Sequence, residues 1–190
     1  MTGWHRWFGT FTGIVGLTVA ALPVAVLVGW ALARHRRAGG ATPSWALRSS
    51  LAEVGMILGT VPMVWMILLP GSRAGRGPGR VSLIPLRDLA TILTHDGPVA
   101  ATVQIVGNLI PFAALGFFGP MRFTALASIP RILALGAACS IVVETAQYVF
   151  QLDRVSSVDD VLLNTVGAGL AALASHRWWR TRVSAETVPA

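Results

Sequence analysis

Charged residues are scarce in this chain, and lysine is absent altogether. Only 12% of the 190 residues are charged and 54% are hydrophobic, whereas about a quarter of a typical soluble domain is charged. The composition therefore disfavours a soluble globular domain and is typical of an integral membrane protein. All fifteen basic residues are arginines. They lie mainly between apolar runs, where such charges orient membrane helices, so the net charge of +7 does not indicate nucleic-acid binding.

Cysteine and the common catalytic motifs are also missing or rare. Cys139 is the one cysteine, which excludes an internal disulfide and a multi-cysteine metal site. The sequence contains no HExxH, GxSxG, Walker or cysteine/histidine zinc pattern. We therefore expect no cofactor and no metal-ligand set.

Five long apolar runs are present instead. They cover residues 11–33, 51–69, 100–119, 132–150 and 158–175, and each approaches or exceeds the roughly 18 to 20 residues that span a bilayer. The first run ends in ALA at residues 31–33, which resembles a signal-peptide cleavage site. The run is longer than a typical signal h-region and Arg34 follows it directly, so a retained helix is expected. We predict an all-α integral membrane helical bundle of about five transmembrane helices.

The loops suggest how the chain is divided and oriented. Residues 1–80 hold two N-terminal helices, residues 81–175 a three-helix domain, and residues 176–190 a C-terminal tail. The Gly-, Arg- and Pro-rich residues 71–80 predict a loop, and VSLIPLRDLATIL after them predicts a short helix along the membrane surface. With the N-terminus outside the cytoplasmic membrane, nine arginines lie inside and six outside. This bias predicts an outer N-terminus and an inner C-terminus.

The few acidic residues are concentrated in one region. Half of the eight acids lie between residues 144 and 160. Ser140, Glu144, Gln147 and Gln151 are spaced 4, 3 and 4 apart, which places them on one stripe of a helix. Because a carboxylate facing lipid costs at least a few kcal/mol, this stripe is expected to face other helices or a wet cavity.

Two further helices carry polar residues at the same spacing. Asp160 and Asn164 are four apart in the fifth run, as are Gln104 and Asn108 in the third. The fourth run ends, and the third and fifth begin, at the same membrane face. We therefore expect one candidate functional cluster at that end of the bundle, formed by Asn108, Ser140, Glu144, Gln147, Arg154, Asp160 and Asn164.

Structural interpretations compete with a functional one. Ser157 and Asp160 resemble a capping box at the start of the fifth run, and Asp159 suits the same helix end.

Amides in membrane helices often bond only to another helix, which is the structural alternative for Gln104 and Asn164. Glu144 and Arg154 are suited to a purely structural ion pair. Glu53 sits alone near the opposite end, where a snorkelling or structural role is favoured over a functional one.

Three segments resemble the VanZ-like family of small bacterial membrane proteins. They are NLIPFAALG from Asn108, SIVVETAQ from Ser140 and RVSSVDDVLLNTVGA from Arg154. The family pattern is Asn-x-x-x-Phe-x-Pro-x-Gly, then Ser-x-x-x-Glu-x-x-Gln, then Arg followed by Asp-x-x-x-Asn-Thr-x-Gly-Ala. The resemblance covers residues 81–172, which makes residues 81–175 a VanZ-like domain. The matching positions are Asn108, Phe112, Gly116, Ser140, Glu144, Gln147, Arg154, Asp160, Asn164, Thr165, Gly167 and Ala168.

The chain departs from this pattern at three positions. Ala114 stands where a proline is expected, and Pro111 supplies one three positions earlier, which predicts a displaced helix kink. The upstream segment SLIPL, residues 82–86, resembles an Asn-Leu-x-Pro-Phe segment that often precedes these motifs, and in it Ser82 and Leu86 replace the asparagine and the phenylalanine.

The resemblance implies a location in the cell envelope. The family is named for a protein that confers low-level resistance to the glycopeptide teicoplanin. The leading hypothesis is therefore a protein that acts at the outer membrane face on a lipid-linked envelope component or on glycopeptide access. Its partners would be membrane lipid and such a precursor or glycopeptide.

Two alternatives stay open. One is an intramembrane enzyme in which Glu144 and Asp160 act as base and acid on a lipid phosphate bound by Arg154, or hold a divalent ion. The other is a membrane assembly module whose polar stripes only lock helices together.

Overall fold

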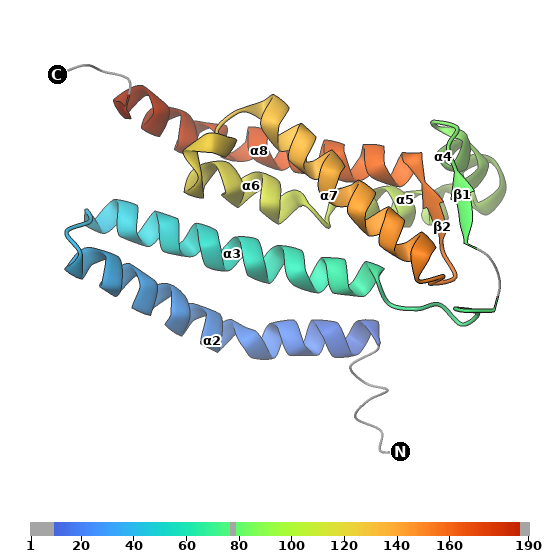
Figure 1. Cartoon of the computed structure of the whole chain (residues 1–190), viewed down its shortest axis with the longest axis horizontal. Coiled ribbons are helices and arrows are strands. Elements are labelled where there is room, and N and C mark those ends of the chain that lie inside the picture. Colours follow the sequence, from blue (N-terminus) through green and yellow to red (C-terminus); the bar gives the residue numbers. More distant parts are fainter. Residues whose placement is uncertain (1–9, 77–78, 187–190) are drawn as a thin grey trace, which may run out of the picture.

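A computed structural model describes residues 10–76 and 79–186, and within them five helical segments are long and apolar enough to cross a membrane (Figure 1). The protein is an all-α multi-pass membrane bundle, as expected. The five spans are α2 (Phe11–Ala38), α3 (Pro43–Ile67), the combined segment Gly97–Arg122, α7 (Ile129–Val149) and Val158–Trp179 of α8 (Val158–Glu186).

Local sequence signals account for the ends of the first two helices. The Thr10 hydroxyl accepts a hydrogen bond from the backbone N–H of Gly13 at 3.1 Å and so caps α2. Pro43 occupies the first turn of α3, where its missing N–H costs no helical hydrogen bond. Apolar side chains such as Val26, which is 70% exposed, point away from the bundle. In a bilayer such side chains meet lipid while the helix satisfies its own backbone.

The third span is broken into α5 (Gly97–Leu109) and α6 (Ala113–Arg122). Pro111 lies in the break, where its missing N–H and its ring interrupt the helical ladder. The kink expected from the displaced proline is therefore present, although as a full interruption. The run predicted over residues 100–119 is consequently two helices that are joined by a short connection.

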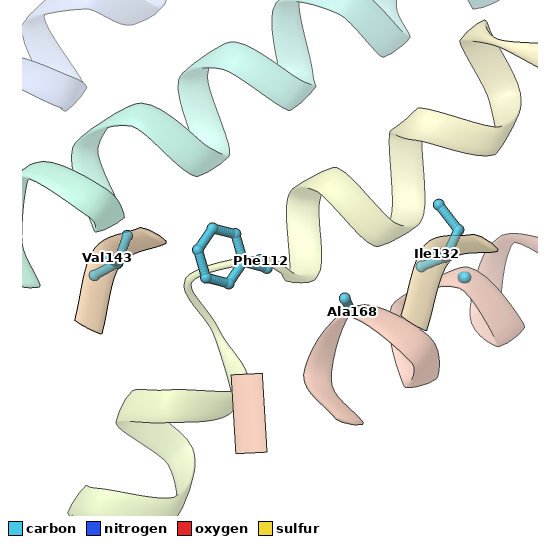
Figure 2. Packing of buried hydrophobic residues seen from close by; sticks show 5 residues of the cluster. Phe112, Ile132, Val143 and Ala168 are labelled. Atoms are coloured by element: carbon cyan, nitrogen blue, oxygen red, sulfur yellow. The ribbon is translucent and has the colours of Figure 1, made fainter. Parts of the chain in front are cut away.

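Buried residues of this connection form the centre of the apolar core. Phe112, which is 2% exposed, packs with Ile132 and Val143 of α7 and with Ala168 and Ala172 of α8. Figure 2 shows Phe112 at the connection, with Val143 on one side of it and Ala168 on the other. The break in the third span therefore supplies an aromatic side chain to the core.

Helix α8 lies at the centre of the bundle and packs against α5, α6 and α7, while α3 packs against α6 and α2. Two glycines permit the closest approaches. A Cβ at Gly116 would collide with the Ala168 carbonyl, and one at Gly167 would collide with the Leu109 carbonyl. Small residues at these crossings bring the backbones together, as is common in membrane bundles.

One end of the bundle carries additional short elements (Figure 1). The strands β1 (Arg80–Ser82) and β2 (Val155–Ser157) pair in parallel, with Val81 opposite Ser156. The short helix α4 (Arg87–Thr91) continues through a π-helical turn, η1 (Ile92–Asp96), into α5. The short helix predicted within residues 81–93 therefore begins only at Arg87, because Val81 and Ser82 belong to β1, and it continues through η1.

The opposite end carries the η2 turn (Thr124–Leu126) between α6 and α7 and the end of α8. Helix α8 runs to Glu186, so most of the segment expected as a C-terminal tail is helical.

Candidate functional site

A cavity of about 640 Å³ lies at the end of the bundle that carries β1 and β2. Residues of α3, α5, α7 and α8 line it, together with residues of β1, α4, η1, β2 and the turn between α7 and β2. Six of the seven predicted cluster residues line the cavity, namely Asn108, Glu144, Gln147, Arg154, Asp160 and Asn164. Ser140 is fully buried behind them on α7. The structure thus brings together the residues whose co-location follows from helix alternation and polar spacing.

Asp160 lies in the first turn of α8, with its carboxylate directed toward α5. Its Oδ1 accepts hydrogen bonds from Gln104 Nε2 at 3.0 Å and from Asn108 Nδ2. The two amides are four residues apart on one face of α5, which is why both reach the same oxygen. The capping-box interpretation is therefore wrong for Asp160, whose carboxylate bonds to α5 instead of its own helix end.

Glu144 of α7 is buried, with 9% of its surface exposed. Its Oε2 accepts a hydrogen bond from the backbone N–H of Ser157 at 3.0 Å. Its backbone carbonyl accepts another from the Ser156 hydroxyl at 2.8 Å. These two bonds fix β2 against α7 and hold the Glu144 carboxylate in place at the cavity wall.

Each of these two carboxylates keeps one oxygen free of protein partners. Among the residues that the structure describes, Glu144 Oε1 and Asp160 Oδ2 make no hydrogen bond. Arg154 is near enough to interact electrostatically with Glu144, yet the two form no ion pair within the described chain. The ion-pair interpretation is therefore wrong, and the cavity presents two acceptors and an exposed guanidinium group.

The other amides of the cluster connect helices. Gln147 Nε2 donates to the Ile67 carbonyl at the end of α3 at 3.0 Å. Asn164 Nδ2 donates to the Ser140 hydroxyl at 2.9 Å and so links α8 to α7. Asn164 Oδ1 is buried and has no hydrogen-bond partner among the described residues. Gln147, Asn164 and Ser140 therefore position the helices around the cavity.

Asp159 has a role that the sequence pattern did not reveal. Its carboxylate accepts hydrogen bonds from the backbone N–H groups of Leu86 at 2.5 Å, Asp88 at 3.0 Å and Leu89 at 3.1 Å. It therefore caps α4, and the expectation that it caps its own helix is wrong. Ser157 does cap α8, because its hydroxyl accepts from the Asp159 N–H at 3.2 Å. No local signal in the sequence indicates that Asp159 caps a different helix.

Asp88 is a cavity residue that the sequence analysis missed. Its carboxylate accepts hydrogen bonds from the Ser82 hydroxyl at 2.9 Å and the Ser157 hydroxyl at 2.5 Å. Ser82 thus supplies a hydrogen bond although it departs from the expected asparagine. The one available signal was an isolated acid inside the apolar segment SLIPLRDL.

A comparison with known protein families matches the part of the chain that contains the cavity residues. A family model described as VanZ/LLP1 matches residues 56–179. The chain belongs to the VanZ/LLP1 family. The match begins inside α3 and includes every residue that lines the cavity, so it reaches further upstream than the three motifs. No curated protein sequence and no solved structure matches the chain.

The VanZ/LLP1 motif positions serve two physical purposes in this structure. Glu144, Arg154 and Asp160 line the cavity, whereas Gly116 and Gly167 allow the close helix crossings. The motifs therefore combine residues that shape the cavity with residues that hold the helices around it.

Outside the cavity, this VanZ/LLP1 protein has an ion-pair network at the opposite end. Glu53 of α3 pairs with Arg36 of α2 at 2.5 Å and with Arg122 of α6. Glu53 is therefore not alone, and it joins three helices in a structural role. Within the described residues, no group of three or more His, Cys, Asp or Glu side chains is arranged to hold a metal ion.

Proposed function

We propose that this VanZ/LLP1 protein acts at the outer face of the cytoplasmic membrane and handles a lipid-linked component of the cell envelope. One observation carries the proposal. Glu144 and Asp160, from two helices, are held at one cavity by protein donors while each keeps an oxygen available to a ligand. Placing an ionisable side chain inside a membrane bundle costs free energy, and such side chains are commonly functional.

An apolar groove beside the cavity supports a lipid as the bound molecule. The groove has a volume of about 360 Å³ and is lined mainly by apolar side chains, including Ile141, Tyr148 and Val161. It shares Glu144 and Ser157 with the polar cavity. A molecule with a polar end and a hydrocarbon chain would fill both spaces at once.

The arginine distribution supports the outer face. With the N-terminus outside, nine arginines lie on the inner side and six on the outer side, in the sense of the positive-inside rule. In that orientation the cavity opens to the exterior. Handling an envelope lipid at the outer face would change which envelope components a glycopeptide antibiotic reaches. This would connect the site with the teicoplanin resistance for which the family is named.

Conservative replacement of the two carboxylates tests the proposal. The variants Glu144→Gln and Asp160→Asn are expressed in a strain that lacks the gene. We expect that neither variant reverses the glycopeptide sensitivity or the other envelope phenotypes of that strain, although both accumulate to wild-type levels. Each variant retains a carbonyl acceptor for the observed hydrogen bonds but removes the negative charge.

Glu53→Gln is the matched control because it removes a membrane carboxylate at the opposite end. After normalisation to the amount of folded protein, it is expected to rescue like the wild type. Full rescue by both cavity variants would overturn the proposed site.

A second candidate function, an intramembrane enzyme, is favoured by the same two free oxygens. One carboxylate would accept a proton from an attacking group and the other would donate one to the leaving group of a lipid substrate. Purified protein incubated with labelled envelope lipids, with and without Mg²⁺ or Mn²⁺, tests this. Absence of turnover under all conditions would reject the enzyme and leave lipid binding as the activity.

A further inference from the structure

A strongly basic recess of about 400 Å³ lies next to the polar cavity. Its lining includes Arg73, Arg76, Arg80, Arg154 and one acid, Asp153. We call these four arginines the arginine bowl. They come from the loop between α3 and β1 and from the turn between α7 and β2, two segments that are far apart in the sequence.

The backbone brings these two segments together at defined positions. The N–H of Gly71 donates to the Leu152 carbonyl at 2.9 Å, and the N–H of Gly75 donates to the Gln151 carbonyl at 3.0 Å. In the parallel strand pair, Arg80 lies opposite Val155. Arg154 directly precedes Val155, so Arg80 and Arg154 both lie at the start of the strand pair, and both line the recess and the polar cavity.

Glycine is required at two positions of this loop. A Cβ at Gly71 would lie 2.9 Å from the Asp153 side chain, and Gly75 has a φ of +71°, which side-chain-bearing residues rarely adopt. The Gly- and Arg-rich composition of residues 71–80 therefore fits a loop that is packed closely against the α7–β2 turn. The bowl is a defined surface in the described part of the chain.

Among the described residues, three of the four arginines in the bowl are not held in ion pairs. Asp153 pairs with Arg73 at 3.5 Å and also accepts its backbone N–H at 3.0 Å. Arg76, Arg80 and Arg154 make no ion pair with any residue that the structure describes. Several guanidinium groups that converge without carboxylate partners provide the planar, multiple donors that bind phosphate oxygens.

The bowl is continuous with the two spaces already described. Arg80 and Arg154 line both the bowl and the polar cavity, and the cavity shares Glu144 and Ser157 with the apolar groove. A basic recess, a polar cavity and an apolar groove thus follow one another at one end of the bundle. This order matches the parts of a lipid that carries a phosphate.

We infer that the arginine bowl binds the phosphate group of a long-chain lipid phosphate, whose hydrocarbon chain lies in the apolar groove beside the carboxylate cavity. The inference rests on the proposed function and names the chemical class of its lipid. It also accounts for a feature of the arginine distribution. The positive-inside rule does not account for arginines on the outer side of the membrane. Four of the six arginines expected there belong to the bowl, and binding of a phosphate explains their presence.

A binding measurement on the purified full-length protein tests the bowl. The probe is dioleoyl phosphatidate, with dioleoylglycerol as the same lipid without the phosphate. The wild type is expected to prefer the phosphatidate, and Arg80→Gln/Arg154→Gln to weaken its binding by about tenfold or more. The matched control is Arg37→Gln/Arg48→Gln, which removes two exposed arginines elsewhere and is expected to bind like the wild type.

Equal affinities in the two double variants, or no preference for phosphatidate over dioleoylglycerol, would overturn the inference. Inorganic phosphate distinguishes the source of the anion. If it displaces phosphatidate at an equal concentration, the bowl takes a free anion and the lipid is rejected.

The groove has its own matched pair of variants. Ile141 lines the groove and Val142 beside it does not. Ile141→Trp is expected to weaken phosphatidate binding about tenfold by filling the groove, whereas Val142→Trp leaves it unchanged. Equal phosphatidate binding by the two variants would show that the hydrocarbon chain of the lipid lies outside the groove, and would contradict the inference.

Failure here is distinguishable from failure of the proposed function. If Glu144→Gln and Asp160→Asn abolish rescue in cells while Arg80→Gln/Arg154→Gln binds phosphatidate normally, the carboxylate site stands and the arginine bowl is rejected.

Discussion

Neighbouring carboxylates in this protein have different partners because of their positions around one helix. Asp159 and Asp160 are consecutive in α8, so their side chains leave the axis about 100° apart. Asp159 bonds to the backbone of α4, whereas Asp160 bonds to the amides of α5. One of them is therefore committed to three backbone donors and the other retains a free oxygen at the cavity.

The role of Asp159 is testable by substitution. Asp159→Ala removes the acceptor of three amide groups, and leaving such donors unpaired costs about 1 to 3 kcal/mol each when they are buried. We expect faster hydrogen exchange at the amides of Leu86, Asp88 and Leu89, measured by mass spectrometry. Asp159→Asn keeps one acceptor oxygen and is expected to have a smaller effect. Unchanged exchange in the alanine variant would contradict the capping role.

At the scale of the elements, close helix crossings determine where the cavity walls lie. Gly167 of α8 meets the backbone of α5 at Leu109, one residue after Asn108. The distance between these two helices therefore sets how Asn108 reaches Asp160.

Gly167→Ala is expected to destabilise the protein by about 1 to 3 kcal/mol, because the added Cβ would collide with the Leu109 carbonyl. Thermal unfolding in detergent is the measurement. The matched control is Gly107→Ala in α5, where a Cβ would meet nothing within 4 Å. Since alanine favours a helix by about 1 kcal/mol over glycine, this variant is expected to be as stable as the wild type or more so. Equal melting temperatures for both variants would contradict this account of the crossing.

At the scale of the whole molecule, the two ends differ in chemistry. One end holds the cavity and the arginine bowl, which are lined by residues of α3, α5, α7 and α8 and of the short segments between them. The other holds Glu53 with its two arginines, which joins α2, α3 and α6. The two ends thus differ, since one presents polar and basic side chains to a cavity and the other holds three helices together.

Cysteine labelling tests the orientation of these ends. Ser72 and Ser44 are exposed at opposite ends of α3, and each is replaced by cysteine in a background where Cys139 is serine. With the N-terminus outside, an impermeant maleimide is expected to label Ser72→Cys in intact cells, and Ser44→Cys only after permeabilisation. The reverse pattern would place the cavity on the cytoplasmic side and contradict the proposed location.

The sequence alone determined the features that depend on local patterns. These patterns are the length of each apolar run, the spacing of polar residues along a helix and the alternating direction of successive helices. Five apolar runs predicted the five spans, because the bilayer requires a minimum apolar length. The polar stripe through Glu144 and Gln147 and the matching pair on α5 predicted one shared cluster. Consecutive membrane helices alternate in direction, so the order of the helices along the chain indicates which helix ends lie at the same membrane face.

The loops at the same end could not be derived in this way. Asp159 and Leu86 are 73 residues apart, and the strand pair joins Arg80 to a segment near residue 155. Short strands, turns and caps of this kind carry no periodic signal, since each depends on a partner from a distant segment. Only the tertiary structure therefore decided that Asp159 caps α4, that Asp88 lines the cavity and that four arginines converge beside Glu144 and Asp160.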